Sequence, residues 1–285
     1  MEAEMEVLEP GLFSTIQDEG RFHFRKFGVP VSGPMDRKAA KIANLVLNNS
    51  SSAAVMEITQ MGPVLKFNGL TQIAVSGGDL SVTINGQSIS NNRAYKVDTA
   101  DILKFGRRKI GCRSYLAISG GFQTESFLNS KSWYEDISDR YKLEKGQKLK
   151  YISTMESSLG TNSIIKIDLQ YLLQQEISVF PGPEFKFLSS QQQKALISRP
   201  FTIDRNNNRM AIQLQELVQN QAKPILKGPV LPGTIQLTPS GKLIILMKDC
   251  QTTGGYPRVF QVSEEGQDIL AQKVMGDKIL FKMAE

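Results

Sequence analysis

The sequence of 285 residues has few of the side chains that most catalytic sites and metal centres use. It contains one histidine, His23, and two cysteines, Cys112 and Cys250. Zinc sites, Ser-His-Asp triads and histidine acid–base pairs need more imidazoles or thiolates than this. The cysteines lie far apart and form no Cys-x-x-Cys spacing, so we expect two buried thiols and no metal site. Any catalysis has to use carboxylates, hydroxyls, amides, Lys or Arg.

Long apolar runs and phosphate-binding motifs are also missing. No stretch approaches the ~20 apolar residues of a membrane-spanning helix, and residues 1–9 are too acidic for a secretory signal. Neither Gly-x-x-x-x-Gly-Lys-Ser/Thr nor Gly-x-Gly-x-x-Gly occurs. The net charge is +6, but the basic residues are dispersed, and the cluster of residues 107–109 is typical of a solvated turn. We expect a cytoplasmic protein that binds neither membrane nor nucleic acid.

Short β-strands dominate what is present. Alternating apolar segments bounded by turn residues predict strands at residues 64–67, 71–76, 81–84, 114–119, 243–248 and 258–262. The pair Asn85-Gly86 predicts a type I′ hairpin turn, because both residues accept a positive φ. Helices are few: Asp36 is expected to cap one that ends near Leu47, and a shorter one follows Glu265. Residues 155–163 and 186–198 are expected to be loop or exposed helix.

Two weak internal sequence repeats indicate two β-rich lobes. Gly62-Pro63-Val64 is echoed by Gly228-Pro229-Val230, and a turn followed by an alternating strand recurs at residues 101–105, 146–151 and 276–281. We therefore predict an N-terminal lobe over residues 1–155 and a C-terminal lobe over residues 176–285, which are able to interleave.

The densest group of candidate site residues follows the predicted strand 243–248. Glycines there permit close backbone approach, and amide and hydroxyl groups can bind a small polar ligand or an oxyanion. The alternative is a tight turn whose hydroxyls bind their own backbone. The group consists of Gln251, Thr252, Thr253, Gly254, Gly255 and Tyr256.

A second group lies in a Gly- and Pro-rich loop before the first predicted helix. Because a helix start favours anions, Ser32 and Asp36 can border a carboxylate or phosphate site. The alternative is that Asp36 is only a helix cap and that Asp18 and Arg21 form a surface ion pair.

Three weaker candidates stand alone. Glu57 is a carboxylate inside an apolar strand and needs a partner such as Arg21 or Arg209. Asp79 lies in a glycine turn. Arg209 can donate to a carboxylate, or it belongs to a solvated loop.

Taken together, these stretches resemble the allophanate hydrolase subunit 2 family, also described as biotin-dependent carboxyltransferase family proteins and as the C subunit of 5-oxoprolinase. The resemblance covers nearly the whole chain. Its markers are Thr15-Ile16-Gln17-Asp18, Gly28-Val29-Pro30, Ser32-Gly33-Pro34-Met35-Asp36, Glu57-Ile58-Thr59, residues 230–236 and above all Gln251-Thr252-Thr253-Gly254-Gly255-Tyr256-Pro257. It implies a mainly β fold of two cyclophilin-like β-barrel lobes with few short helices.

The resemblance also implies a reaction and partners. The reaction is the ATP-driven opening of 5-oxo-L-proline to L-glutamate. The implied partners are an allophanate hydrolase subunit 1-type protein, which is the B subunit of 5-oxoprolinase, and a third, barrel-type subunit. ATP is then expected to bind mainly to partner subunits. Within that reaction we assign Gln251, Thr252 and Thr253 to the developing oxyanion, and Arg21 or Arg209 to the substrate carboxylate.

Two other functions stay open. One is a biotin-dependent carboxyltransferase component, as in urea amidolyase; it requires a separate biotin carrier, because the chain has no Ala-Met-Lys-Met motif. The other is a non-enzymatic regulator that antagonises a histidine-kinase inhibitor. This chain also departs from the usual family pattern around Arg209 and Lys131.

Overall fold

The computed structural model describes residues 2–153, 169–220 and 225–284. Strands dominate it and the α-helices are short, so the predicted mainly β class is confirmed. The described residues fall into two compact units, one of Met1–Arg21 and Ser32–Leu172, the other of Phe22–Val31 and Leu173–Glu285. The predicted lobe bounds, 1–155 and 176–285, stay a prediction, and the predicted segment 155–163 lies outside the described residues.

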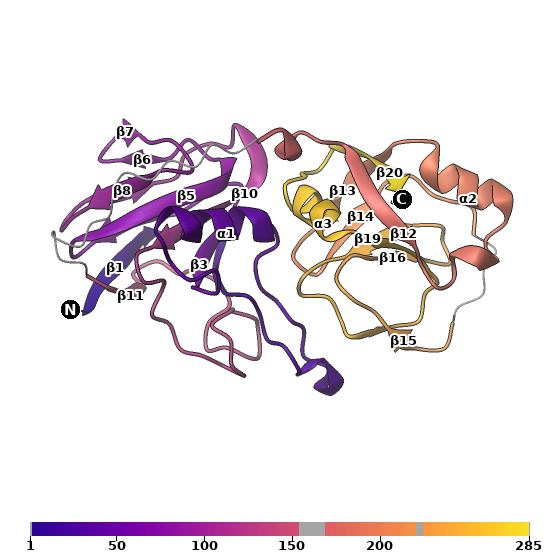
Figure 1. Cartoon of the computed structure of the whole chain (residues 1–285), viewed down its shortest axis with the longest axis horizontal. Helices are drawn as coiled ribbons and strands as arrows, with labels where there is room; N and C mark the ends of the chain where they lie inside the picture. Colours follow the sequence, from indigo (N-terminus) through magenta and orange to yellow (C-terminus); the bar gives the residue numbers. More distant parts are fainter. Residues whose placement is uncertain (1, 154–168, 221–224, 285) are drawn as a thin grey trace. The chain divides into compact units, whose positions relative to one another are not determined.

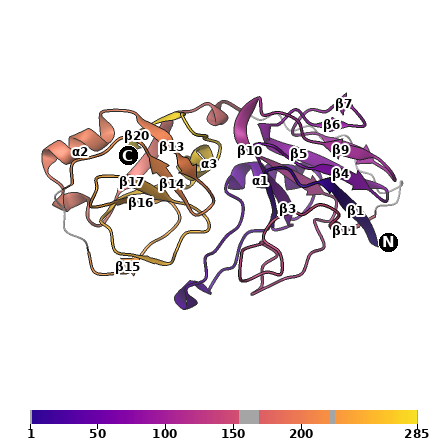
Figure 2. The same ribbon diagram turned by 180° about the vertical axis from the view of Figure 1, so that it is seen from behind.

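The first unit consists of two antiparallel sheets (Figures 1 and 2). The six-stranded sheet has the order β11 (Lys148–Ile152), β1 (Glu2–Glu9), β4 (Val64–Phe67), β9 (Ile102–Lys104), β6 (Thr83–Ile84) and β7 (Gln87–Ser88). The five-stranded sheet has the order β2 (Phe13–Gln17), β3 (Val55–Thr59), β10 (Ile110–Ile118), β5 (Thr71–Asp79) and β8 (Ala94–Val97).

Strand alternation explains how this unit builds its core. Leu116 and Ile118 of β10 point into a cluster shared by both sheets, whereas Tyr115 and Ala117 point to the opposite face. The helix α1 (Arg37–Val46) covers that opposite face through its small residues, including Ala39 and two further alanines. The central strand β10 is therefore buried on both sides, and most of its residues are apolar, with Arg113 and Ser114 as buried polar exceptions.

The second unit is a closed barrel of seven strands (Figure 1). Its order is β12 (Glu176–Pro181), β19 (Arg258–Val262), β16 (Thr234–Leu237), β17 (Leu243–Leu246), β14 (Ala211–Leu214), β13 (Phe201–Asn207) and β20 (Lys278–Met283). A parallel pairing between β12 and β20 closes it. In its interior the Phe281 ring packs between two others. Its centroid lies 5.4 Å from that of Phe201 and 5.7 Å from that of Phe260.

Short elements complete this unit. Two strands, β15 (Gly228–Pro229) and β18 (Thr253–Gly254), form a small ladder apart from the barrel. The helices are α2 (Ser190–Ile197) and α3 (Glu264–Ala271), and one-turn helices occur at η1 (Arg25–Phe27) and η4 (Phe185–Phe187). A further one, η3 (Leu169–Leu172), ends the first unit.

Several local predictions are confirmed. Asn85 and Gly86 have φ values of 50° and 82° and join β6 to β7. Asp36 caps α1 by accepting a hydrogen bond from the Ala39 amide at 2.8 Å. The helix expected after Glu265 is α3, and the segment 186–198 contains the largely exposed α2. No helix among the described residues has the length and apolarity to span a membrane.

Candidate functional site

The predicted residues of the first unit form an internal polar network. Asp18 accepts hydrogen bonds from the hydroxyls of Ser130 and Ser132, at 2.5 and 2.7 Å, and from the Lys131 amide at 2.6 Å. Arg21 is fully buried and donates to the Ser132 carbonyl, so it cannot form a surface ion pair with Asp18. These contacts give both side chains a role in holding loop 130–132.

A protein carboxylate already occupies the predicted anion position before α1. Glu57 is fully buried and accepts from the Met35 amide at 2.7 Å and from the Tyr115 hydroxyl at 2.8 Å. The Tyr115 oxygen in turn accepts from the Asp36 amide at 2.8 Å. Burial, and next the Glu57 charge, raise the pKa of Tyr115 well above its ordinary value, so it stays a donor. The loop before α1 therefore binds Glu57.

The other predicted residues near α1 have protein partners too. Ser32 is buried and accepts from Arg21 Nη1 at 3.2 Å. Asp36 accepts a second hydrogen bond, from the Tyr171 hydroxyl at 2.8 Å. The cation that the structure shows beside Glu57 is Arg113, whose Nε lies 3.7 Å from Glu57 Oε1. Arg113 lies 56 positions from Glu57 in the sequence, so no local pattern predicts this pair.

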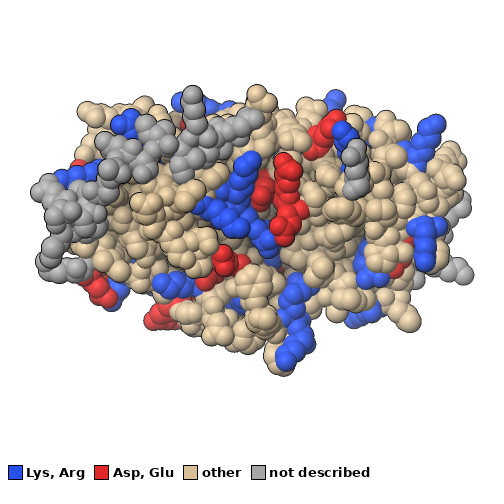
Figure 3. Space-filling view, in the orientation of Figure 1, with Lys and Arg blue, Asp and Glu red and all other residues tan. Residues whose placement is uncertain are grey.

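Asp79 lies at the surface rather than in a site. Its carboxylate accepts from the Ser81 amide at 2.8 Å and pairs with Lys109 at 3.7 Å, while 41% of its side chain is exposed. Arg107 and Arg108 are exposed in the same turn. Basic and acidic side chains are interspersed over the face shown in Figure 3. The exposure of Asp79 and its surface ion pair agree with a plain solvated turn.

The second unit holds the glycine-containing loop over residues 251–257. The Val230 amide donates to the Thr252 carbonyl at 3.1 Å, and the ladder of β15 and β18 pairs Thr253 with Pro229. The Gly255 carbonyl accepts from the Ile225 amide at 3.1 Å. The backbone of this loop is therefore bound at consecutive residues, and its side chains do not have to stabilise the turn.

Three polar side chains of this loop do not stabilise the turn. The carboxamide of Gln251 and the hydroxyls of Thr252 and Thr253 make no hydrogen bond with the residues that the structure describes, and Gln251 Oε1 is buried. The alternative predicted above, hydroxyls bound to their own backbone, is not what the described contacts show. A buried acceptor without a protein partner costs free energy unless a water or a ligand donates to it.

Gly254 is needed for packing. A Cβ there would lie 2.4 Å from Gln236 Nε2 and 3.2 Å from Val230 Cγ1. Among the residues that the structure describes, the same atom on Gly255 would meet the Ile225 carbonyl, at 3.7 Å. Tyr256, the last predicted member of the loop, is 40% exposed. A side chain at Gly254 would thus force the Gln236 carboxamide and Val230 to shift, whereas Gly255 has more space among the described residues.

Arg25 is the cation that the structure places against this loop. It lies in the segment Phe22–Val31, which packs with the second unit. One guanidinium nitrogen, Nη2, donates to the Val230 carbonyl, and the side chain also hydrogen-bonds to the Cys250 thiol. The other terminal nitrogen, Nη1, is buried without a partner among the described residues. Nothing in the local sequence distinguishes Arg25 from Lys26, so sequence reasoning missed it.

Arg209, one of the two predicted carboxylate clamps, already binds a protein carboxylate. Its Nε and Nη2 lie 2.6 and 3.1 Å from the two oxygens of Asp249, and both side chains are about nine-tenths buried. Arg258 forms a comparable pair with Glu184, at 2.9 and 2.8 Å. These pairs fix the two ends of the loop. Arg209 as a ligand for substrate stays a prediction.

The thiol beside the loop is neutral. Burial raises the pKa of Cys250 to about 11, although Arg25 acts in the opposite direction. Burial likewise raises the pKa of Cys112 in the first unit. Among the described residues, no group of three or more His, Cys, Asp or Glu side chains could hold a metal ion. The loop therefore offers amide, hydroxyl and guanidinium groups.

Comparison with known proteins decides the family. The protein-family model described as carboxyltransferase domain, subdomain A and B, matches residues 27–283. This chain belongs to that carboxyltransferase family. The resemblance inferred from the motif residues is thereby confirmed, and the loop described above lies inside the matched region.

Relatives of this carboxyltransferase-family chain differ in size. It is 28% identical to the C subunit of 5-oxoprolinase from Escherichia coli over 97% of its length and 90% of that protein. The corresponding 5-oxoprolinase protein of Haemophilus influenzae is 30% identical over 98% of the chain and 90% of that protein. Among solved structures, the Kluyveromyces lactis urea amidolyase has a TM-score of 0.87 and 28% identity.

The match to the solved structures covers only part of those proteins. This chain is matched over 98% of its length, but it spans 18% of the urea amidolyase. It spans 55% of the protein TTHA0988, which matches with a TM-score of 0.87 and 26% identity. This chain therefore corresponds to one part of each of those larger proteins.

Proposed function

We propose that this chain is the C subunit of a cytoplasmic, ATP-dependent 5-oxoprolinase that converts 5-oxo-L-proline to L-glutamate. Its two partners in this proposal are an allophanate hydrolase subunit 1-type protein and a barrel-type protein. The observation that carries the proposal is the end-to-end match with two bacterial 5-oxoprolinase proteins of that kind, which covers 97–98% of this chain and 90% of each relative. Nearly equal lengths argue for an equivalent role in the complex.

The free groups of the second unit suit this substrate. 5-Oxoproline carries a carboxylate, a lactam carbonyl and a lactam N–H. In the proposed site, Arg25 Nη1 donates to the carboxylate, and the orphaned Gln251 Oε1 accepts from the lactam N–H. The hydroxyls of Thr252 and Thr253 then donate to the lactam oxygen. This assigns the carboxylate to Arg25 instead of Arg21 or Arg209.

The same arrangement favours the transition state for ring opening. An unstrained lactam is a resonance-stabilised amide, so its carbonyl has to be activated, and phosphorylation of the lactam oxygen by ATP supplies that activation. When water adds to the phosphorylated carbon, negative charge develops on the water-derived oxygen as it loses its proton, and fixed hydroxyl donors beside this carbon stabilise that charge without reorganisation. The ring C–N bond then breaks, the nitrogen takes a proton, and hydrolysis of the resulting acyl phosphate releases glutamate and phosphate. The sequence contains no Walker-type phosphate loop, so in this proposal ATP binds mainly to, or together with, the partner subunits.

Reconstitution tests the proposal. Glutamate release from 5-oxoproline and ATP is measured with this chain alone, and then with the products of its neighbouring genes for the allophanate hydrolase subunit 1-type and barrel-type proteins. We expect turnover only in the complete mixture. Stable association of all three chains without turnover would contradict the assignment.

Variants test the site within the assembled complex. Arg25→Gln is expected to raise the KM for 5-oxoproline, because it removes a charge-assisted bond to the carboxylate. Thr252→Val is expected to lower kcat, because its hydroxyl acts on developing charge. Lys26→Gln is the matched control for Arg25, since Lys26 is exposed beside it. Unchanged kinetics in both site variants, with assembly intact, would remove these residues from the site.

A second candidate function is biotin-dependent carboxyl transfer. The family description and the structural match to urea amidolyase favour it. It predicts that this chain accepts a carboxyl group from a carboxylated biotin carrier protein, which can be followed with ¹⁴C-bicarbonate. Label transfer without any glutamate release would select this function. Tight binding to a partner without either activity would favour the regulatory role.

A further inference from the structure

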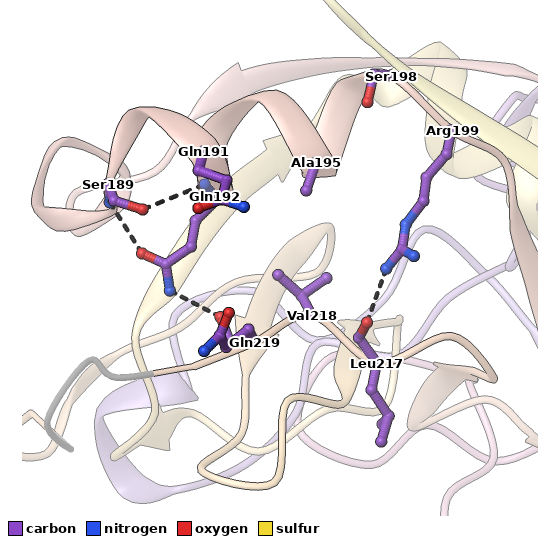
Figure 4. Close-up of a pocket in the computed structure, with 9 residues that line it drawn as sticks. All are labelled: Ser189, Gln191, Gln192, Ala195, Ser198, Arg199, Leu217, Val218 and Gln219. Carbon is purple, nitrogen blue, oxygen red and sulfur yellow. Dashed lines mark hydrogen bonds between the residues drawn. The ribbon is translucent and has the colours of Figure 1, made fainter.

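The second unit contains a cavity of about 430 Å³ between α2 and residues 217–219 (Figure 4). This volume lies in the range of small-molecule sites, which is roughly 300–1,000 Å³. The lining combines hydroxyls, amides, three apolar side chains and one cation, and it includes no carboxylate. Its residues are Ser189, Gln191, Gln192, Ala195, Ser198, Arg199, Leu217, Val218 and Gln219.

Arg199 is held in place but is not neutralised. Its Nη2 donates to the Leu217 carbonyl at 2.7 Å, as Figure 4 shows, and its guanidinium carbon lies 5.3 Å from the centre of the Phe201 ring. Its Nε is buried and has no partner among the described residues, none of which brings a carboxylate within ion-pair distance of it. A half-buried cation without an ion-pair partner is stabilised by an anion in the space beside it.

The neighbouring carboxylate of Glu216 forms no ion pair with Arg199 among the described residues. Although burial opposes it, the Thr202 hydrogen bonds and then the Arg199 charge lower the pKa of Glu216. Glu216 accepts from the Thr202 amide at 2.6 Å and from the Thr202 hydroxyl at 2.7 Å. Its carboxylate is thus directed to β13 and does not line the cavity. The guanidinium of Arg199 is left as the charged group of this lining.

Hydrogen bonds between the two walls hold the cavity open. The Gln192 carboxamide accepts from the Ser189 amide at 2.9 Å and donates to the Gln219 carbonyl at 2.7 Å, which links α2 to the opposite segment (Figure 4). In contrast, the side chains of Gln191, Ser198 and Gln219 make no hydrogen bond with described residues. The walls are fixed, and neutral donors and acceptors remain for a ligand.

We propose that this cavity, called here the α2 pocket, binds a small hydroxylated organic anion through its carboxylate. The guanidinium of Arg199 offers Nη1, which makes no hydrogen bond with a described residue, for a charge-assisted hydrogen bond to a carboxylate. The free amides and hydroxyls bind the polar groups of the remainder. A single cation balances the single charge of a carboxylate, whereas a phosphate dianion would need a second cation that this lining does not contain. The proposal is independent of the loop at residues 251–257.

The test follows the Nε–Hε signal of Arg199 by ¹H–¹⁵N NMR in the full chain. Gluconate, which has one carboxylate and several hydroxyls, is the probe. Sorbitol is the matched uncharged control, inorganic phosphate is the rival anion, and chloride keeps the ionic strength constant. We expect a saturable shift with gluconate, no shift with sorbitol, and weaker binding of phosphate.

Two variants and one control make the result specific. Arg199→Gln removes the signal, so gluconate binding is then measured by calorimetry and is expected to weaken by about 10-fold or more. Ala195→Leu fills the cavity from α2 and is expected to abolish the shift while the Arg199 signal itself persists. Lys194→Gln, on the exposed side of α2, is expected to bind like the wild type.

Each other outcome overturns the proposal. A shift that grows linearly with gluconate and never saturates means ionic screening only. Tighter binding of phosphate than of gluconate contradicts the carboxylate assignment. Equal binding in Ala195→Leu and in the wild type means that gluconate binds elsewhere on the chain.

Discussion

Arg209 and Asp249 form a two-bond ion pair, with Nε–Oδ2 at 2.6 Å and Nη2–Oδ1 at 3.1 Å. The Asp249 amide also donates to the Arg209 carbonyl at 2.9 Å, so backbone and side chains join the same two residues. Asp249 lies two positions before Gln251, and the pair fixes the start of the loop at residues 251–257. Its geometry indicates a structural role for both residues.

We predict that Asp249→Ala lowers the free energy of unfolding by about 3–5 kcal/mol, because it leaves the buried Arg209 guanidinium without its counter-ion. The double variant Arg209→Met with Asp249→Ala should lose clearly less than the sum of the single variants. Urea denaturation of the four proteins of this cycle measures the coupling. Additive losses would show that the two side chains do not stabilise each other.

The two adjacent glycines of the loop should respond differently to the same change. Gly254→Ala brings a Cβ to 2.4 Å from Gln236 Nε2, inside a buried environment, and we expect a loss of about 1–3 kcal/mol from overpacking. Gly255→Ala meets only an ordinary contact at 3.7 Å and should stay within about 0.5 kcal/mol of the wild type. Thermal unfolding of both variants decides the point. A larger loss at Gly255 would contradict this account of the loop.

The Glu184–Arg258 pair predicts a dependence of stability on pH. The Arg258 hydrogen bonds hold the pKa of Glu184 below its ordinary value of 4.5. A lowered pKa in the folded state stabilises the protein above the ordinary value, and this stabilisation is lost as the pH falls through the folded pKa. Glu184→Gln should therefore cost about 1.5–3 kcal/mol at neutral pH and progressively less below about pH 4.

Urea denaturation at several pH values measures this difference. Glu176→Gln is the matched control, because Glu176 pairs with Lys282 at the surface, where 54% of its side chain is exposed. That variant should change stability little at any pH. A cost for Glu184→Gln that is the same at neutral and acidic pH would refute the role of its charge.

The buried tyrosines of the first unit give another test. Tyr115 donates to Glu57 and accepts from the Asp36 amide, with both partners buried, whereas Tyr151 donates to the Gly69 carbonyl at 2.7 Å. Tyr115→Phe leaves two buried groups short of a bond and should cost about 2–4 kcal/mol, roughly twice the cost of Tyr151→Phe. Chemical denaturation compares the two. Equal losses would show that the Asp36 amide finds another acceptor.

Much of the local structure was predictable because it depends on neighbouring residues. The Asn85-Gly86 turn follows from the tolerance of both residues for a positive φ, and the start of α1 follows from Asp36 bonding to an amide three positions away. The strand β4 (Val64–Phe67) and the strand β19 (Arg258–Val262) have the predicted bounds, since alternation of apolar and polar residues marks a half-buried strand directly.

The partners of charged side chains were not predictable in this way. The contact between Arg25 and Val230 joins residues 205 positions apart, and the contact between Tyr115 and Glu57 joins residues 58 positions apart. The sequence by itself determined the β-rich class, the first helix cap, the hairpin and the polar content of the loop at residues 251–257. Only the tertiary structure decided that Glu57 binds the loop before α1, that Asp249 binds Arg209, and that Arg25 lies against the loop at residues 251–257. Those pairings form because burial of apolar side chains in the sheets and the barrel brings distant chain segments together. Local sequence patterns do not predict such contacts.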